Sequence, residues 1–289
     1  MNLFILGLGY AATVFAKSMR ARKWRVVGTV RSEEKARLLR SAGLAAMPFE
    51  VGGAGIDTVA ARLRAADALL VSISPSANSL SDRLALSIAQ ADRLRWIGYL
   101  STIGVYGDHG GAWIDETTPA APVSERGRAR LGAEQDWAGL GARAGKPVVI
   151  FRLPSIYGPT RNALAALRNG TARRIVKPRQ VFNRVHVADI ASALVLSVES
   201  DRTSAVYNLT DDEPAPPQDV VNYAAALLGV EAPPEIAFED AKLTGMAASF
   251  YGENKRVRNA LIRRSLGFAP TYPSYREGLR ALLSQGEGR

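Results

Sequence analysis

Apolar runs alternate with stretches of helical period along the first half of the chain. The runs are nearly continuous, which is typical of strands buried on both faces of a parallel sheet. They lie at residues 2–6, 24–30, 44–49, 68–74, 95–101 and 146–152. Apolar positions recur at helical spacing at residues 13–20, 32–41, 56–66 and 80–91. This order predicts an α/β protein with a doubly wound parallel sheet of the Rossmann type, with ligands at the carboxyl ends of the strands.

The turn after the first strand has the pattern Gly7-x-Gly9-x-x-Ala12. Gly7 allows a sharp turn, Gly9 allows the backbone to approach a pyrophosphate, and Ala12 lets the helix pack closely on the sheet. The start of the helix then offers free N–H groups to phosphates. We therefore predict a dinucleotide site formed by Gly7, Gly9, Tyr10, Ala11 and Ala12. The alternative is a purely structural turn.

Arg31 ends the second strand, where the chain of such a unit meets the adenosine ribose. An acidic residue there binds the 2′-hydroxyl of NAD, whereas a guanidinium suits the 2′-phosphate of NADP. Ser32 and Lys35 follow, and no acidic residue precedes Glu33. We assign Arg31, Ser32 and Ser72 to the cofactor site and predict NADP in preference to NAD. The alternative is that Arg31 only faces solvent.

The composition argues against several kinds of site. Among the 289 residues Cys is absent and the histidines are His109 and His186, so we predict neither a thiol nucleophile nor a metal site. The net charge of +10 favours anionic ligands such as NADP or nucleotide sugars. Because the basic residues are scattered and match no nucleic-acid motif, we predict no nucleic-acid partner.

The apolar opening from Leu3 to Ala16 has the length of a targeting segment. No basic residue precedes it, it is too short to span a bilayer, and its glycines match the phosphate turn. We therefore expect a soluble cytoplasmic protein with no membrane partner.

A longer motif follows at the end of the fifth strand. The segment from Tyr99 to Gly107, with Thr102 and Tyr106, resembles the YxSTxxVYG signature of the extended short-chain dehydrogenase/reductase family, which includes NAD(P)-dependent nucleotide-sugar epimerases and dehydratases. Later segments resemble further landmarks of that family over nearly the whole chain; they are residues 115–116, 151–159, 183–189 and 207–211. The resemblance implies the family's fold, an NAD(P) cofactor and an active site around Thr102.

The chain departs from this family at the catalytic pair, a Tyr and a Lys four residues apart at a helix start. The corresponding positions hold Arg126 and Arg130, and no Tyr occurs between Tyr106 and Tyr157. An Arg does not release a proton near neutral pH, so Arg126 cannot be the general acid or base. It could clamp a carboxylate or phosphate, or stabilise an alkoxide, and Arg130 could keep the ribose contact of the Lys.

Other side chains near this position are candidates for proton transfer. The resemblance places Thr102 in the active site, where its hydroxyl could orient a carbonyl or relay a proton. Tyr106 and Tyr157 resemble packing or loop-anchoring residues of the family. His186 titrates near neutrality, yet its place at a predicted helix entry favours a structural hydrogen bond. The predicted catalytic residues are therefore Thr102, Arg126 and Arg130.

The resemblance also implies a division of the chain. Residues 1–153 are expected to form the NAD(P)-binding domain, with 184–200 packing back onto it, and residues 154–183 and 201–289 the substrate lobe. The first functional hypothesis is an NADP-dependent oxidoreductase or epimerase/dehydratase-like enzyme acting on a small polar substrate, either anionic or nucleotide-linked. The second is a catalytically silent NAD(P)-binding sensor or partner-binding protein. The family further implies a homodimer.

Overall fold

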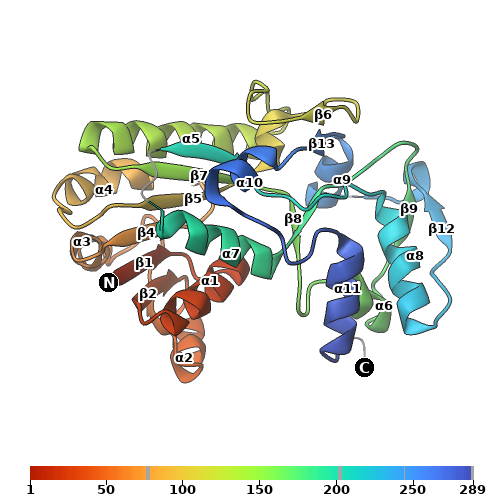
Figure 1. The fold of residues 1–289 in the computed structure, drawn as a ribbon, viewed down its shortest axis with the longest axis horizontal. Helices are drawn as coiled ribbons and strands as arrows, with labels where there is room; N and C mark the ends of the chain where they lie inside the picture. Colours follow the sequence, from red (N-terminus) through yellow and green to blue (C-terminus); the bar gives the residue numbers. More distant parts are fainter. Residues whose placement is uncertain (76–78, 201–203, 244, 288–289) are drawn as a thin grey trace.

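The computed structural model describes residues 1–75, 79–200, 204–243 and 245–287 (Figure 1). Its largest element is a seven-stranded parallel sheet with the strand order β11–β7–β5–β4–β1–β2–β3. The strands are β1 (Asn2–Leu6), β2 (Arg25–Val30), β3 (Ala45–Pro48), β4 (Ala68–Val71), β5 (Ile97–Thr102), β7 (Val148–Leu153) and β11 (Ala205–Asn208). All six strands predicted from apolar runs are present, and the predicted doubly wound parallel sheet is confirmed.

Helices cover both faces of the sheet, which explains the unbroken apolar runs. Along β1, Leu3 and Ile5 face one core, whereas Phe4 and Leu6 face the other. The first core is closed by α1 (Tyr10–Ala21), α2 (Glu33–Ser41), α7 (Val187–Val198) and α10 (Ala260–Leu266). The second core is closed by α3 (Ile56–Arg64), α4 (Leu80–Ala89) and α5 (Glu125–Ala144). The late helix α7 lies against α1, the first helix of the chain.

Part of the chain after β7 builds a second, smaller part beside the sheet (Figure 1), whereas α7, β11 and α10 return to the sheet. Its core, which includes Tyr157, Tyr275 and Leu279, is enclosed by α6 (Ala163–Arg168), α8 (Pro217–Leu228) and α11 (Tyr275–Ser284). The described residues also form three short helices: η1 (Ile103–Tyr106), which follows β5, and η2 (Phe238–Asp240) and α9 (Gly245–Tyr251), which lie between α8 and α10 in the chain. Helix α8 ends at Gly229, because that glycine adopts a left-handed φ of 66°.

Three pairs of very short parallel strands accompany the main sheet. They are β8 (Ser155–Tyr157) with β10 (Arg184–His186), β9 (Arg174–Val176) with β12 (Glu235–Ala237), and β6 (Trp113–Ile114) with β13 (Arg256–Val257). The sequence pattern did not predict them, because two or three residues are too few to show the period of a strand.

Helix α5 is positioned by its two caps. At its start the Ser124 hydroxyl accepts a hydrogen bond from the backbone N–H of Gly127 at 3.1 Å. At its end Gly145 adopts a left-handed φ of 65°. Residues 126, 130 and 134 follow each other at intervals of four, so they lie along one face of this helix.

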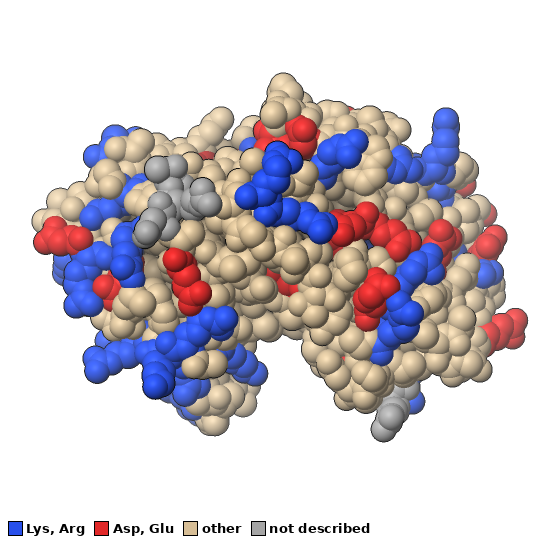
Figure 2. All heavy atoms as spheres, viewed as in Figure 1, with Lys and Arg blue, Asp and Glu red and all other residues tan. Residues whose placement is uncertain are grey.

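Charge is unevenly distributed on the face drawn in Figure 2. Lys and Arg side chains gather over the end of the molecule that carries α1 and α2, and a notch separates this end from the part built by α6, α8 and α11. Within the described ranges of the chain, no helix combines the length and the apolar character needed to cross a membrane.

Candidate active site

The turn between β1 and α1 has the conformation that its glycines were predicted to allow. Gly7 adopts a φ of 95°, and a Cβ atom on it would lie 2.7 Å from Cγ2 of Ile73. Its backbone N–H donates to Oγ1 of Thr29 at 2.9 Å, and the N–H of Leu8 donates to the Thr29 carbonyl at 2.7 Å. The turn is thus held against β2 and β4, and only glycine fits its first position.

Gly9 is the N-cap of α1 and has a different role. A Cβ atom on Gly9 would meet no protein atom within 4 Å, so this backbone borders open space. No side chain caps the helix, and no acidic residue occupies its first turn. The free N–H groups and the positive end of the helix dipole therefore face a space that suits a phosphate.

A cavity of about 610 Å³ opens at this turn. It is lined by Gly7, Gly9, Arg31, Ser32 and Ser72, which the sequence assigned to one cofactor site. The structure therefore brings together residues from the ends of β1, β2 and β4, which are neighbours in the sheet.

Four of the predicted cofactor residues do not line this cavity: Arg130, described below, and three residues of α1. Ala11 and Ala12 are buried on the side of α1 that faces the first core. Tyr10 is half-buried, and its hydroxyl donates to the Pro159 carbonyl at 2.8 Å. The side chains of these three residues thus anchor the helix, while the glycines border the cavity.

Arg31 and Lys35 supply positive charge at one end of the cavity, where Glu50 supplies one carboxylate. Ser32 is the N-cap of α2, and its hydroxyl accepts a hydrogen bond from the backbone N–H of Lys35 at 3.3 Å. The two cations offer an anionic group positive charge at this place, while Glu33 and Glu34 occupy the first turn of α2. The residues of this cavity therefore fit a dinucleotide whose phosphates lie at Gly9 and whose ribose lies near Arg31.

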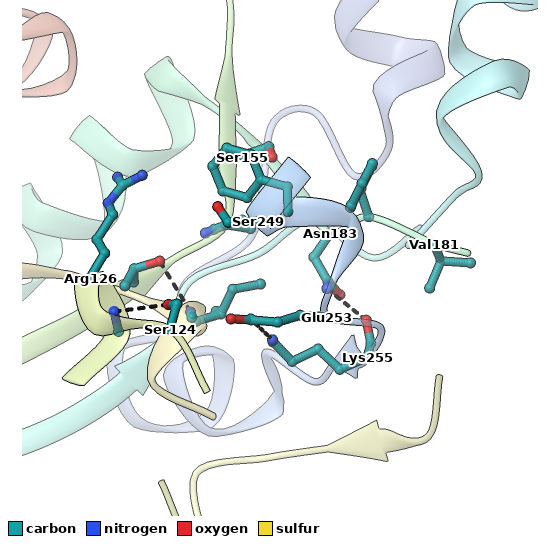
Figure 3. Close-up of a pocket in the computed structure, with 15 residues that line it drawn as sticks. Ser124, Arg126, Ser155, Val181, Asn183, Ser249, Glu253 and Lys255 are labelled. Carbon is teal, nitrogen blue, oxygen red and sulfur yellow. Dashed lines mark hydrogen bonds and ion pairs between the residues drawn. The ribbon is translucent and has the colours of Figure 1, made fainter. Parts of the chain in front are cut away.

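A second, smaller pocket of about 140 Å³ lies farther along the same edge of the sheet (Figure 3). Thr102 and Arg126 both line it, and Ser124, Ser155 and Asn183 contribute polar side chains. The Thr102 hydroxyl accepts a hydrogen bond from the Gly104 backbone N–H at 3.1 Å. Two of the three predicted catalytic residues thus share one pocket.

Arg126 extends from the first turn of α5 beside Phe250, with its guanidinium carbon 6.0 Å from the centre of the Phe250 ring. The ion pairs of the described residues do not include Arg126. Its charge is therefore available to an anion that enters the pocket.

Arg130, one turn further along α5, is placed differently. Its side chain is buried, and Nη1 donates to the Leu100 carbonyl at 2.9 Å and to the Tyr99 hydroxyl at 3.3 Å, with the Ile73 carbonyl at 3.5 Å. Arg130 therefore joins the ends of β4 and β5 between the two cavities, and it lines neither of them.

The remaining proton-transfer candidates have structural contacts. The hydroxyl of Tyr106 donates to Oδ1 of Asn208 at 2.8 Å, and that of Tyr157 donates to the Ser274 carbonyl at 3.2 Å. His186 is the N-cap of α7, and its Nδ1 accepts from the backbone N–H of Ala188 at 3.2 Å. Burial lowers the pKa of His186 to about 4. The predicted structural hydrogen bond at this helix entry is confirmed.

The small pocket also contains residues that sequence reasoning missed. Glu253 and Lys255 come from the segment between α9 and β13 and form an ion pair at the pocket wall (Figure 3). They follow Thr102 by about 150 residues and match no motif. Only the packing of the second part against the sheet brings them to the site.

Comparison with known proteins identifies the family. A model described as the NAD dependent epimerase/dehydratase family matches residues 76–210. The chain is 30% identical over 282 residues to the protein YeeZ of Escherichia coli, with 93% of this chain and 95% of YeeZ covered. The chain belongs to the NAD-dependent epimerase/dehydratase family. The resemblance to extended short-chain dehydrogenases/reductases is therefore confirmed.

Solved structures in the comparison share the epimerase/dehydratase fold. A conserved protein of unknown function from Silicibacter pomeroyi has a TM-score of 0.88 at 43% identity, over 99% of both chains. UDP-glucuronic acid 4-epimerase from Bacillus cereus, solved in complex with NAD, has a TM-score of 0.79 at 16% identity, over 99% of both chains. The second likeness extends to the fold alone.

Proposed function

We propose that this protein is an NADP-dependent enzyme of the epimerase/dehydratase family that transfers hydride to or from a small anionic substrate. The observation that carries the proposal is the pair of cavities on one edge of the sheet. The larger cavity surrounds the β1–α1 glycine turn, and the smaller one contains Thr102 and Arg126. A dinucleotide that extends from β2 across β1 and β4 points its far end toward the smaller pocket, because the strands occur in that order.

The proposed preference for NADP rests on charge. Arg31 and Lys35 both line the adenosine end of the larger cavity, where a 2′-phosphate adds negative charge. Glu50 lies on the same wall and offers a carboxylate to a ribose hydroxyl. NADP bound in this way would supply hydride chemistry, and the chain would supply position and charge.

The proposed substrate is small because its pocket is small. Pockets for drug-sized ligands usually measure about 300–1,000 Å³, whereas this pocket measures about 140 Å³. A small organic acid therefore suits the site better than a nucleotide-linked sugar. Arg126 would hold its carboxylate, and the Thr102 hydroxyl would orient the reacting oxygen. Arg130 would keep the ends of β4 and β5 in register between cofactor and substrate.

The proposed division of labour follows the two parts of the fold. Residues 1–153 with 184–200 would bind the cofactor, since both cores of the sheet draw on these segments. Residues 154–183 and 201–289 would complete the substrate pocket, to which they contribute Ser155, Asn183 and Phe250, except that β11 and α10 belong to the main sheet and its first core.

Fluorescence titration of NADPH and NADH tests the cofactor assignment. Arg31→Glu is expected to weaken NADPH binding by about 10- to 100-fold, the equivalent of one charge-assisted contact, and to change NADH binding little. Arg37→Glu is the matched control, because Arg37 is an exposed residue of α2 outside the cavity. Equal effects of the two variants on NADPH would contradict the assignment.

Turnover is tested with NADPH and a panel of 2-oxo acids, with their amides as uncharged controls. Arg126→Gln is expected to raise KM for the acid by at least about tenfold and to leave the amide unaffected. The alternative is a catalytically silent sensor, which the replacement of the family's Tyr by Arg126 favours. That alternative predicts tight NADPH binding without oxidation of NADPH by any member of the panel.

A further inference from the structure

The small pocket lacks the proton donor of its family. Arg126 holds its proton at every physiological pH, and an unactivated hydroxyl such as that of Thr102 is a weak acid. The ionisable residues that line the pocket are Arg126, Glu253 and Lys255. Lys255 carries an amine in the wall of this pocket, so its geometry decides whether it can serve as the donor.

Lys255 is almost completely buried, with 4% of its surface exposed. Its Nζ donates to Oε2 of Glu253 and to the Gly107 carbonyl, which leaves one of its three N–H bonds without an assigned acceptor. The Glu253 side chain remains 14% exposed. Figure 3 shows this pair beneath the pocket, with the Glu253 carboxylate and the Lys255 amine side by side.

The backbone around Lys255 is fixed by Asn183. The side-chain amide of Asn183 donates to the Lys255 carbonyl at 2.9 Å, and its Oδ1 accepts from the backbone N–H of Val257 at 2.8 Å. Asn183 belongs to the segment between β9 and β10 and also lines the pocket. The amine is therefore held at one place in the pocket wall, as the geometry of proton transfer requires.

Two carboxylates lie near the amine. Burial lowers the pKa of Lys255, while the carboxylates of Glu253 and Asp108 oppose that shift. Arg126 lines the same pocket, but Figure 3 shows its guanidinium directed away from the pair of Glu253 and Lys255. The balance leaves an ammonium group whose pKa lies below that of an exposed lysine, which suits a general acid.

We propose that Lys255 is the proton donor and acceptor of this pocket, in place of the tyrosine whose position Arg126 occupies. The inference rests on the proposed function. In the reducing direction, NADPH, when bound, would supply a hydride to the carbonyl carbon of the substrate, and the C=O π electrons would move to oxygen. That oxygen takes a proton from Nζ, which becomes a neutral amine and regains its proton from solvent beside Glu253. The oxidising direction reverses each transfer.

The first test measures the titration of the Lys255 amine by NMR. The protein has seven lysines, so labelling with [ε-¹³C]lysine gives a small set of NMR signals, and Lys255→Met assigns one of them. The Lys255 signal is expected to titrate at lower pH than the other six. It is also expected to shift when oxamate, an unreactive small carboxylate, is added with NADP⁺. The proposal is overturned if the Lys255 signal titrates at the same pH as the other lysines, or if its chemical shift does not change when oxamate is added.

The second test uses the 2-oxo acid that is turned over. Lys255→Met is expected to lower kcat by at least about 100-fold with NADPH binding unchanged, and to remove the loss of rate at high pH expected of the wild type. Lys255→Arg keeps the positive charge, but a guanidinium does not release a proton near neutral pH, so it should not restore kcat. A purely structural lysine would be rescued by this substitution.

Lys177→Met is the matched control. Lys177 is also partly buried, and its Nζ also donates to a backbone carbonyl, that of Tyr251, but it does not line the pocket. If Lys255→Met turns over as fast as Lys177→Met, the proton-donor role is excluded while the proposed function stands. If NADP⁺ does not bind at all, the proposed function fails, and the Lys255 titration still decides whether the amine has the acidity proposed here.

Discussion

Inside the second core of the molecule, the carboxylate of Glu134 accepts hydrogen bonds from Nε and Nη2 of Arg152, the latter at 2.7 Å. The side chains are 4% and 9% exposed, and the Ser101 hydroxyl also donates to Glu134 at 2.5 Å. Glu134 lies two turns after Arg126 on one face of α5. The pair thus fixes α5 against β5 and β7, and with it the position of Arg126.

Removal of one partner of this pair should be costly. Glu134→Leu leaves the Arg152 charge buried and unpaired, and we expect a loss of about 3–5 kcal/mol in the free energy of unfolding measured with urea. The double variant Glu134→Leu/Arg152→Met should recover most of that loss. The control is Glu33→Gln, which breaks an exposed pair with Arg40 and should cost less than about 1 kcal/mol. A double variant no more stable than the single one would contradict a charge-based explanation.

The two glycines of the β1–α1 turn should respond differently to alanine. Gly9→Ala places its methyl group in open space at an ordinary φ of −81°, so stability should stay within about 0.5 kcal/mol while NADPH binding weakens at least about tenfold. Gly7→Ala places an alanine in a left-handed conformation, with its Cβ against Ile73. This should lower the free energy of unfolding by about 1–3 kcal/mol. Thermal unfolding and NADPH titration of both variants check this contrast. Unchanged NADPH affinity in Gly9→Ala would mean that no phosphate approaches this turn.

The cap of α5 should affect both stability and substrate binding. Ser124→Ala removes the acceptor of the Gly127 N–H and should lower the free energy of unfolding by about 1 kcal/mol. Because Arg126 lies in the first turn, fraying there should also raise KM for an anionic substrate. Ser124→Asp preserves the cap and should restore stability. Equal stabilities of all three proteins in urea would show that the cap contributes nothing.

His186 should remain neutral well into the acid range. Its folded pKa of about 4 lies below the usual 6.5, so between these values the unfolded chain binds a proton that the folded chain does not. Stability supported by the neutral ring is therefore complete above pH 6.5 and decreases as the pH falls toward 4. NMR titration of a His109→Gln variant, which retains a single histidine, measures the pKa directly. A midpoint near 6.5 would contradict the assignment of His186 to a desolvated cap.

The sequence predicted the helices and strands whose buried apolar positions recur at a regular period. The main-sheet strands β1, β2, β4, β5 and β7 contribute side chains to both cores, and the helices between them carry an apolar stripe, so hydrophobic periodicity identified them. Motif spacing likewise placed Gly7, Arg31 and Thr102 at one edge of the sheet, because parallel strands end on the same side. Arg126 was located by the resemblance, as the position that corresponds to the Tyr of the family's catalytic pair.

The rest of the site depends on contacts between distant segments. Glu253 and Lys255 reach the pocket because of two hydrogen bonds to Lys255. The Asn183 side chain donates to the Lys255 carbonyl, and the Gly107 carbonyl accepts from the Lys255 amine. Such contacts leave no period and no spacing in the sequence. Arg130 illustrates the same limit, since its chemical type suited a ribose contact but its guanidinium is satisfied by strand carbonyls that the sequence does not reveal.

The last strand of the main sheet has a consequence for engineering. The chain enters the smaller part after β7 and later returns to the main sheet. Two elements that follow this return complete the sheet side of the molecule: α7, which covers α1, and β11, which pairs with β7. A fragment truncated at Leu153 would thus leave β7 as a bare edge and strip the apolar side of α1, and both promote aggregation. Domain exchange or isolated expression of the nucleotide-binding half must therefore retain the chain through Asn208.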